Sequence, residues 1–259
     1  MINLTNIGRV FFGIAVTEIG LQAIYEHDFP YILQLPDHFW APGHVILALV
    51  FGLIFTLAGI CIIFKKWTRE VSLAFGAILL LIFCFYYIPF EILTSPNYKH
   101  FDDWENAEKE LAFAGGALVI AGCFPAKNRN SFFGFLGKLI PAGAVIFAVT
   151  MICFGILHFV VGKDAASYVP VWIPWHLFWI YFCGAALIGA GIAIIFKIKT
   201  RLFATLLGIM IFIWFISLHI PRVIVSPAAY LGSEITSACL ALAYSGSAFV
   251  IAGSAKKTA

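Results

Sequence analysis

Ionisable and hydrogen-bonding side chains interrupt several apolar stretches of this sequence, and these are the residues suited to chemistry. Glu18 lies nine residues after Arg9, which is about 13 Å along a helix at 1.5 Å per residue. Gln22 follows one helical turn later and shares a face with Glu18. His219 and Arg222 are three residues apart and also share a face. Carboxyl, imidazole and guanidinium groups of this kind are able to bind a polar headgroup or to carry protons.

These groups predict a polar pocket that opens outward from a membrane, with Glu18 at its floor. An unpaired charge near the centre of a bilayer costs at least about 2.5 to 3.5 kcal/mol, so an ionisable residue at that depth needs a function or a partner. The candidate pocket residues are Glu18, Gln22, His44, Glu91, His158, His176, His219, Arg222 and Glu234. The alternative is a structural network in which Glu18 is protonated or hydrogen-bonded and Arg222 only reaches outward.

The histidines and cysteines add two further interpretations. His44 and His176 each stand two residues after a proline, in the first turn of an apolar stretch. Neutral imidazoles on facing helices are able to hold haem or a transition metal, whereas interfacial imidazoles also hydrogen-bond lipid headgroups. No metal site is predicted. The six cysteines include no C-x-x-C pair, which predicts buried free thiols rather than a thiol–disulfide relay.

The elements that position these residues are expected to be membrane helices. The 259 residues are 62% hydrophobic and 11% charged, against about 25% charged in an ordinary soluble domain. So few charged side chains do not cover the exterior of a soluble fold of this size, and the sequence therefore predicts a lipid bilayer as the solvent. The net charge of +3 comes from scattered Lys and Arg, which argues against nucleic-acid binding.

Eight stretches are apolar and long enough to cross about 30 Å of hydrocarbon as helices. They do not show the strict alternation of β-barrel strands, so the predicted fold class is an all-α integral membrane protein with eight transmembrane helices. The expected spans are residues 7–25, 43–64, 70–92, 106–124, 139–161, 175–196, 202–224 and 235–253.

Charge sets the expected orientation. With a cytoplasmic N-terminus, twelve of the sixteen Lys and Arg residues fall on the cytoplasmic side, and only Lys99, Lys109, Lys163 and Arg222 fall on the other. Nearly all the acidic residues and every histidine lie in the outer half. Because Lys and Arg resist translocation, this asymmetry predicts that both termini are cytoplasmic.

The chain contains an internal duplication. Residues 42–69 align without a gap to residues 174–201, with twelve identities. The alignment continues in the other spans, where it pairs Gly8 with Gly143, Phe12 with Phe147, Gly20 with Gly155, and residues 111–122 with 242–253. This pattern predicts two tandem four-helix units, residues 1–126 and 127–259. Four is an even number of spans, so the units are expected to be parallel repeats.

The second unit carries a distinctive set of residues. Its motif elements are His158-Phe159, Pro170, Pro174, the stretch from Gly184 to Gly191, Arg201 and the run His219-x-Pro221-Arg222. With these elements the unit resembles the DoxX/DoxD-like membrane proteins, which are four-helix proteins of bacteria and archaea.

The first unit looks like a diverged copy of the second. The motif residues that it keeps are Pro42, His44, Gly59, Arg69 and Pro89. The motif residues that it replaces are His158 by Ala23, His219 by Tyr87 and Arg222 by Phe90. The resemblance therefore implies an asymmetric site that lies mainly in the second unit.

The resemblance also implies a bacterial cytoplasmic membrane and a link to thiosulfate:quinone oxidoreduction or to respiratory and oxidative-stress partners. Three function classes stay open: a quinone- or redox-linked accessory subunit of a membrane complex, a parallel-repeat carrier for a small solute, and a non-catalytic scaffold. The resemblance and the outer His, Arg and Glu residues favour the first class. The duplication and Glu18 favour the second. Whether the protein is an enzyme stays open, and quinone and haem are the candidate cofactors.

Overall fold

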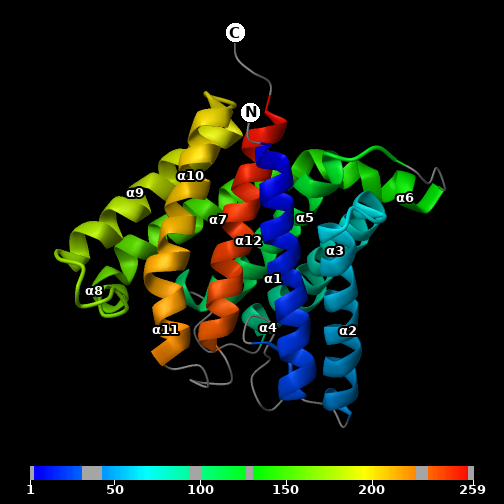
Figure 1. Cartoon of the computed structure of the whole chain (residues 1–259), viewed down its shortest axis with the longest axis horizontal. Helices are drawn as coiled ribbons and strands as arrows, with labels where there is room; N and C mark the ends of the chain where they lie inside the picture. Colours follow the sequence, from blue (N-terminus) through cyan, green and yellow to red (C-terminus); the bar gives the residue numbers. More distant parts are fainter. Residues whose placement is uncertain (1–2, 31–42, 94–100, 127–130, 226–232, 256–259) are drawn as a thin grey trace.

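The computed structural model describes residues 3–30, 43–93, 101–126, 131–225 and 233–255, and every regular element within these ranges is a helix (Figure 1). The predicted all-helical fold class is thereby confirmed for the described residues. Seven of their helices are long and apolar enough to cross a bilayer. Length and composition thus support a multi-pass membrane protein.

Long α-helices and short α-, 3₁₀- or π-helical segments follow one another along the chain. Their bounds are α1 (Leu4–Glu26), α2 (His44–Ile63), α3 (Thr68–Ile82), η3 (Phe83–Tyr87), α4 (Ile88–Leu93), η4 (Phe101–Trp104), α5 (Glu105–Gly122), α6 (Ser131–Leu136), η5 (Gly137–Leu139), α7 (Ile140–Val160), α8 (Gly162–Ala166), α9 (His176–Ile195), α10 (Thr200–Trp214), η6 (Phe215–His219), α11 (Ile220–Val225) and α12 (Ser233–Ser254).

Helix α5 differs from the other long helices in its charge. It coincides with the span expected at 106–124, but its first two turns carry Glu105, Glu108, Lys109 and Glu110. It is therefore not among the seven apolar helices, and length and composition do not establish an eighth span. Most of α5 is buried by its neighbours, and Glu110 has no exposed surface.

Two long helices pass through a π-helical turn just before a proline. In η6, the N–H of Ile220 donates to the carbonyl of Phe215, five residues earlier, and Pro221 follows. The segment η3 repeats this pattern before Pro89. Proline lacks the N–H that an α-helix needs at this point, so a local change of register accommodates it. The wider turn also redirects the side chains at its end.

The helix bounds recur along the chain. Helices α2 and α9 start at residues 44 and 176 and end at 63 and 195, an offset of 132 residues. The same offset relates α3 to α10, η3 to η6 and α4 to α11. The neighbours match as well: α1 packs on α2 and α12, whereas α7 packs on α9 and α5.

Glycines allow close helix crossings at matching places. A Cβ on Gly20 of α1 would lie 2.6 Å from the carbonyl oxygen of Gly52 in α2. A Cβ on Gly155 of α7 would lie 2.7 Å from the carbonyl oxygen of Gly184 in α9. Both distances are too short for a side chain, so each backbone approach requires glycine.

The two ends of the described chain meet at one end of the bundle. Helices α1 and α12 are antiparallel, with Thr5 against Gly253 near one end and Gln22 against Thr236 near the other. The first turn of α1 and the last turn of α12 therefore lie together, and the turns after α2 and α9 share that end (Figure 1). These turns hold Lys65, Lys66, Lys197 and Lys199. Five other cations used in the orientation argument lie outside the described residues: Lys99, Lys127, Arg129, Lys256 and Lys257.

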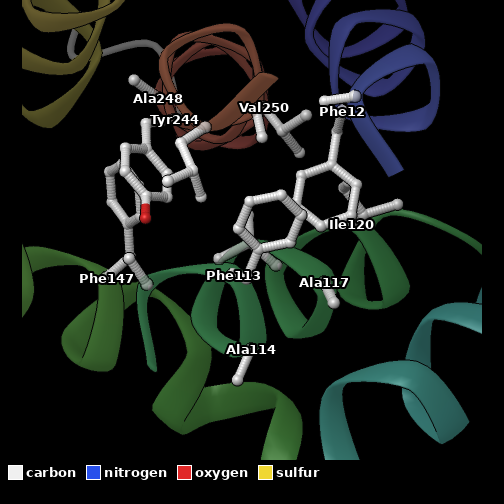
Figure 2. Close-up of a cluster of buried hydrophobic side chains, with 14 of the residues drawn as sticks. Phe12, Phe113, Ala114, Ala117, Ile120, Phe147, Tyr244, Ala248 and Val250 are labelled. Carbon is white, nitrogen blue, oxygen red and sulfur yellow. The ribbon is translucent and has the colours of Figure 1, made fainter. Parts of the chain in front are cut away.

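Aromatic side chains from both halves of the chain form one core (Figure 2). Phe12 of α1 and Phe113 of α5 have ring centroids 5.3 Å apart. Tyr244 of α12 packs 5.9 Å from Phe113 and 6.4 Å from Phe147 of α7. Residues on both sides of the expected boundary at 126/127 thus pack together, and aromatic burial of this kind dominates core energetics.

The outward surface is apolar, as a bilayer requires. Helix α10 exposes Leu202, Leu206, Ile209 and Ile213, each between 43% and 56% of its surface. A soluble protein would not leave such a continuous apolar face in water.

Candidate functional site

The first group of candidate residues joins α1 to α12. Cys239 Sγ donates to Glu18 Oε2 across 2.8 Å, and Thr236 Oγ1 donates to Gln22 Oε1 across 2.8 Å. Gln22 Nε2 donates in turn to Glu26 Oε1 across 3.2 Å. Glu18 and Gln22 thus share a face that meets α12, and both carry hydrogen bonds there.

The same contact recurs between α5 and α7 with the residue types exchanged. Cys153 of α7 hydrogen-bonds the carboxyl of Glu108 in α5. The sequence alignment places Cys153 at the position of Glu18, and Glu108 at the position of Cys239. All six cysteines are free, as the sequence predicted, but only Cys183 and Cys239 are buried, and Cys84 is exposed. Cys153 and Cys239 also bind carboxyl groups. Glu108 was not among the predicted site residues. The signal that could have revealed it is that the alignment places an acid opposite a cysteine at both pairs of positions.

The second group contains an ion pair between α11 and α12. Arg222 Nε donates to Glu234 Oε2 across 2.8 Å, and Arg222 Nη2 pairs with Glu234 Oε1. The two parallel hydrogen bonds hold the guanidinium in a fixed plane. Tyr168, which precedes α9, lies with its ring 4.5 Å from Arg222 Cζ and adds a cation–π contact. No pattern in the sequence pointed to Tyr168.

His219 completes this second group at the end of η6. His219 is the last residue of the π turn before Pro221, and its imidazole lies near the charged groups of Arg222 and Glu234. Its Nδ1 atom is buried and has no hydrogen-bond partner in the described part of the chain. Buried polar atoms are nearly always hydrogen-bonded, so this nitrogen is a candidate contact for a ligand.

A third group lies at the matching place in the first half of the chain. Glu91 of α4 is buried, and it lies near Tyr86 and Tyr87 of η3 together with Glu110. Both carboxyl oxygens of Glu110 and the Tyr86 hydroxyl are buried without a hydrogen-bond partner among the residues that the structure describes. Hydropathy gives no sign of this burial, because Glu110 falls near one end of the expected span 106–124, whereas most of α5 is enclosed by protein.

The remaining candidate histidines do not converge on a cofactor. The Nδ1 atom of His158 lies 2.7 Å from the carbonyl oxygen of Phe154 on its own helix. His44 and His176 begin α2 and α9, which lie on opposite sides of the bundle, so these two imidazoles do not fit a haem held between them (Figure 1). The described residues contain no group of three or more His, Cys, Asp or Glu able to hold a metal ion. His38, His100 and Pro42 lie outside the described residues.

Helix α12 separates the first two groups. Glu234 and Thr236 are two residues apart, so they point about 200° away from each other around the helix. Glu234 accordingly meets α11, whereas Thr236 and Cys239 meet α1. The structure therefore brings Glu18 together with Gln22, and His219 with Arg222 and Glu234, on different faces of α12.

Comparison with known proteins adds no assignment to this geometry. No family model, no curated protein and no solved structure gave a significant match to the chain.

Proposed function

We propose that the protein crosses a bacterial cytoplasmic membrane eight times, as two tandem parallel four-helix repeats at residues 1–126 and 127–259. The 132-residue offset of the helix bounds and the matched glycine crossings support the repeat. The lysine-bearing turns after α2 and α9 share one end with both described chain ends, and the positive-inside rule assigns that end to the cytoplasm. Helix α5 is the eighth span, with its charged turns shielded by protein rather than facing lipid.

We propose further that this is a DoxX-like, quinone- or redox-linked accessory subunit of a membrane complex. The observation that supports it best is the buried, unpartnered Nδ1 of His219 beside the ion pair of Arg222 with Glu234. The first repeat holds Tyr87 and Phe90 at the positions of His219 and Arg222. The imidazole and the ion pair thus belong to one repeat only, as a specific site requires.

The chemistry of the second group suits a quinone headgroup. Bound quinone supplies transfer of two electrons together with protons, and its carbonyl oxygens accept hydrogen bonds. His219 is able to donate to such an oxygen from Nδ1 in the corresponding tautomer. Arg222 is fixed by Glu234 and Tyr168, so its other N–H groups keep set directions. Because the ion pair is neutral overall, the group fits an uncharged headgroup.

The test is an ultraviolet–visible spectrum and an analysis of extracted lipid on the purified full-length protein. We expect retained quinone without haem bands, and a redox or respiratory protein that co-purifies under mild solubilisation. Protein that retains no quinone, and binds none when a short-chain ubiquinone is added, would contradict the proposal.

A second candidate function is that of a proton-coupled carrier for a small solute. It is favoured by Glu110, whose carboxyl oxygens are fully buried and lack hydrogen-bond partners in the described part of the chain. Intramembrane acids of this kind mark ion and proton pathways in transporters. Solute uptake by reconstituted vesicles that depends on a proton gradient, and is lost in Glu110→Gln, would select this function.

A further inference from the structure

Besides His219 Nδ1, a second buried nitrogen without a hydrogen-bond partner among the described residues lies where α9 packs on α10. The indole rings of Trp179 in α9 and Trp214 in α10 lie 6.3 Å apart at 73°. Trp214 Nε1 donates to Cys183 Sγ across 2.8 Å, so its polar group is satisfied. The Nε1 atom of Trp179 is buried and has no hydrogen-bond partner among the described residues.

An unsatisfied indole N–H is costly in a membrane, where water does not replace the missing acceptor. Buried tryptophan normally finds a partner for this group. Indole nitrogen only donates, so the missing partner is an acceptor such as a carbonyl, ether or hydroxyl oxygen. The partner also has to enter an aromatic, apolar environment, because Phe178 and Phe182 pack around Trp179.

Trp179 packs against Trp214 of α10, and His219 lies further along the same helix in η6, which packs on α12. Trp214 directly precedes η6, and in a π turn the residue five positions later lies one turn further along. His219 is that residue. Trp179 Nε1 and His219 Nδ1, both buried and without a hydrogen-bond partner among the described residues, therefore lie toward the same end of the helix that α10 and η6 form.

The first repeat does not reproduce this arrangement. The residues 132 positions before Trp179, Cys183, Trp214 and His219 are Leu47, Phe51, Ile82 and Tyr87. Of these, only Tyr87 carries a polar group. The outer face around Trp179 is open to lipid, since Phe178 and Phe182 are 55% and 50% exposed.

We propose that α9 and α10 bind an apolar molecule that enters from the lipid and accepts a hydrogen bond from Trp179 Nε1 through a carbonyl oxygen. The inference rests on the proposed quinone-linked function, to which it adds the residue that positions the ligand. Two membrane molecules present this chemistry, an isoprenoid quinone and the ester carbonyl of a phospholipid. Trp179 is thus assigned a direct contact with this ligand.

The experiment uses the full-length protein in nanodiscs of ether-linked phospholipid, which lacks ester carbonyls. The probe is a short-chain ubiquinone, and the readouts are saturable quenching of tryptophan fluorescence and the indole N–H resonance of Trp179. That resonance is assigned by its absence in Trp179→Phe. We expect ubiquinone to shift it and Trp179→Phe to weaken binding about tenfold, because the aromatic ring stays and one donor is lost.

Trp67→Phe is the matched control, because Trp67 is exposed in the turn after α2 at the lysine-bearing end. It should bind ubiquinone as the wild type does. Unchanged affinity in Trp179→Phe, with an unmoved Trp179 resonance, would overturn the inference, while the proposed function would survive if His219→Phe still abolished binding. A resonance that moves only when ester-linked lipid replaces ether-linked lipid would assign the Trp179 site to phospholipid and reject quinone as its ligand.

Discussion

Cys239 Sγ donates a hydrogen bond to Glu18 Oε2 across 2.8 Å, and the structure repeats this contact with the residue types exchanged. At the second place Cys153 of α7 bonds to Glu108 of α5. Each pair joins a helix of one proposed repeat to a helix of the other. The α1–α12 and α5–α7 interfaces between the proposed repeats therefore each contain one carboxyl group and one thiol, and either helix is able to supply the acid.

This exchange predicts the outcome of a designed swap. Cys239→Glu alone places two carboxyl groups against each other, and we expect it to destabilise the fold by at least about 2 kcal/mol. Glu18→Cys alone removes the acceptor and should cost about 1 kcal/mol. The double variant restores one acid and one thiol, so its stability should return to within about 1 kcal/mol of the wild type. Thermal unfolding in detergent measures all four proteins, and additive losses in the double variant would refute the pairing.

The helix crossing at Gly155 gives a second prediction. Gly155→Ala adds a Cβ only 2.7 Å from the carbonyl oxygen of Gly184, and α7 has to move away from α9. We expect a loss of about 1 to 3 kcal/mol in the same unfolding assay. Gly189 on α9 has open space around a Cβ, so Gly189→Ala is the control and should be neutral or slightly stabilising. Equal melting temperatures for the two variants would show that the crossing is looser than described.

The ion pair of Arg222 with Glu234 gives a third prediction. Arg222→Met leaves a largely buried carboxylate uncompensated, and Glu234→Gln leaves the guanidinium without its counter-ion. Each single change should lower the free energy of unfolding by about 2 kcal/mol. This loss is smaller than for a fully buried pair, because the Arg222 side chain is 28% exposed. The double variant removes both charges, so it should cost less than the two single changes added together. A coupling energy near zero would mean that the pair is an unimportant surface contact.

Orientation gives a fourth prediction, which is independent of the site. Green fluorescent protein fused to the C-terminus should fluoresce, because the end of α12 lies with the lysine-bearing turns on the proposed cytoplasmic side. A periplasmic alkaline phosphatase reporter at the same place should be inactive. The opposite pair of results would reverse the orientation of the whole bundle.

Hydropathy predicted the helices closely, because the length of a membrane span is fixed by the bilayer. The expected span 175–196 corresponds to α9 at His176–Ile195, and 43–64 corresponds to α2 at His44–Ile63. Helical spacing also placed Glu18 with Gln22 and His219 with Arg222, since residues three and four apart share a face. These are relationships within one helix, which the sequence expresses directly.

Relationships between helices were harder to predict. Glu108 and Cys153 are 45 positions apart in different helices, and no spacing rule connects them. Trp179 lies in a helix that is apolar on every side, so hydropathy gave no sign that its indole N–H would be buried without a partner. The π turns depend on how Pro89 and Pro221 are accommodated, which requires the surrounding bundle. The two halves of the chain have matching helix bounds, and these bounds do not determine the contacts that differ between the halves.

The most direct test of the central claim compares His219→Phe with Tyr87→Phe, because these changes give equivalent positions of the two proposed repeats the same side chain. Both variants are purified in mild detergent, checked for a cooperative thermal transition, and analysed for quinone per mole of protein. We predict that His219→Phe lowers the retained quinone at least tenfold, whereas Tyr87→Phe retains the wild-type amount. Equal retention in His219→Phe and wild type would contradict a quinone site at His219, Arg222 and Glu234.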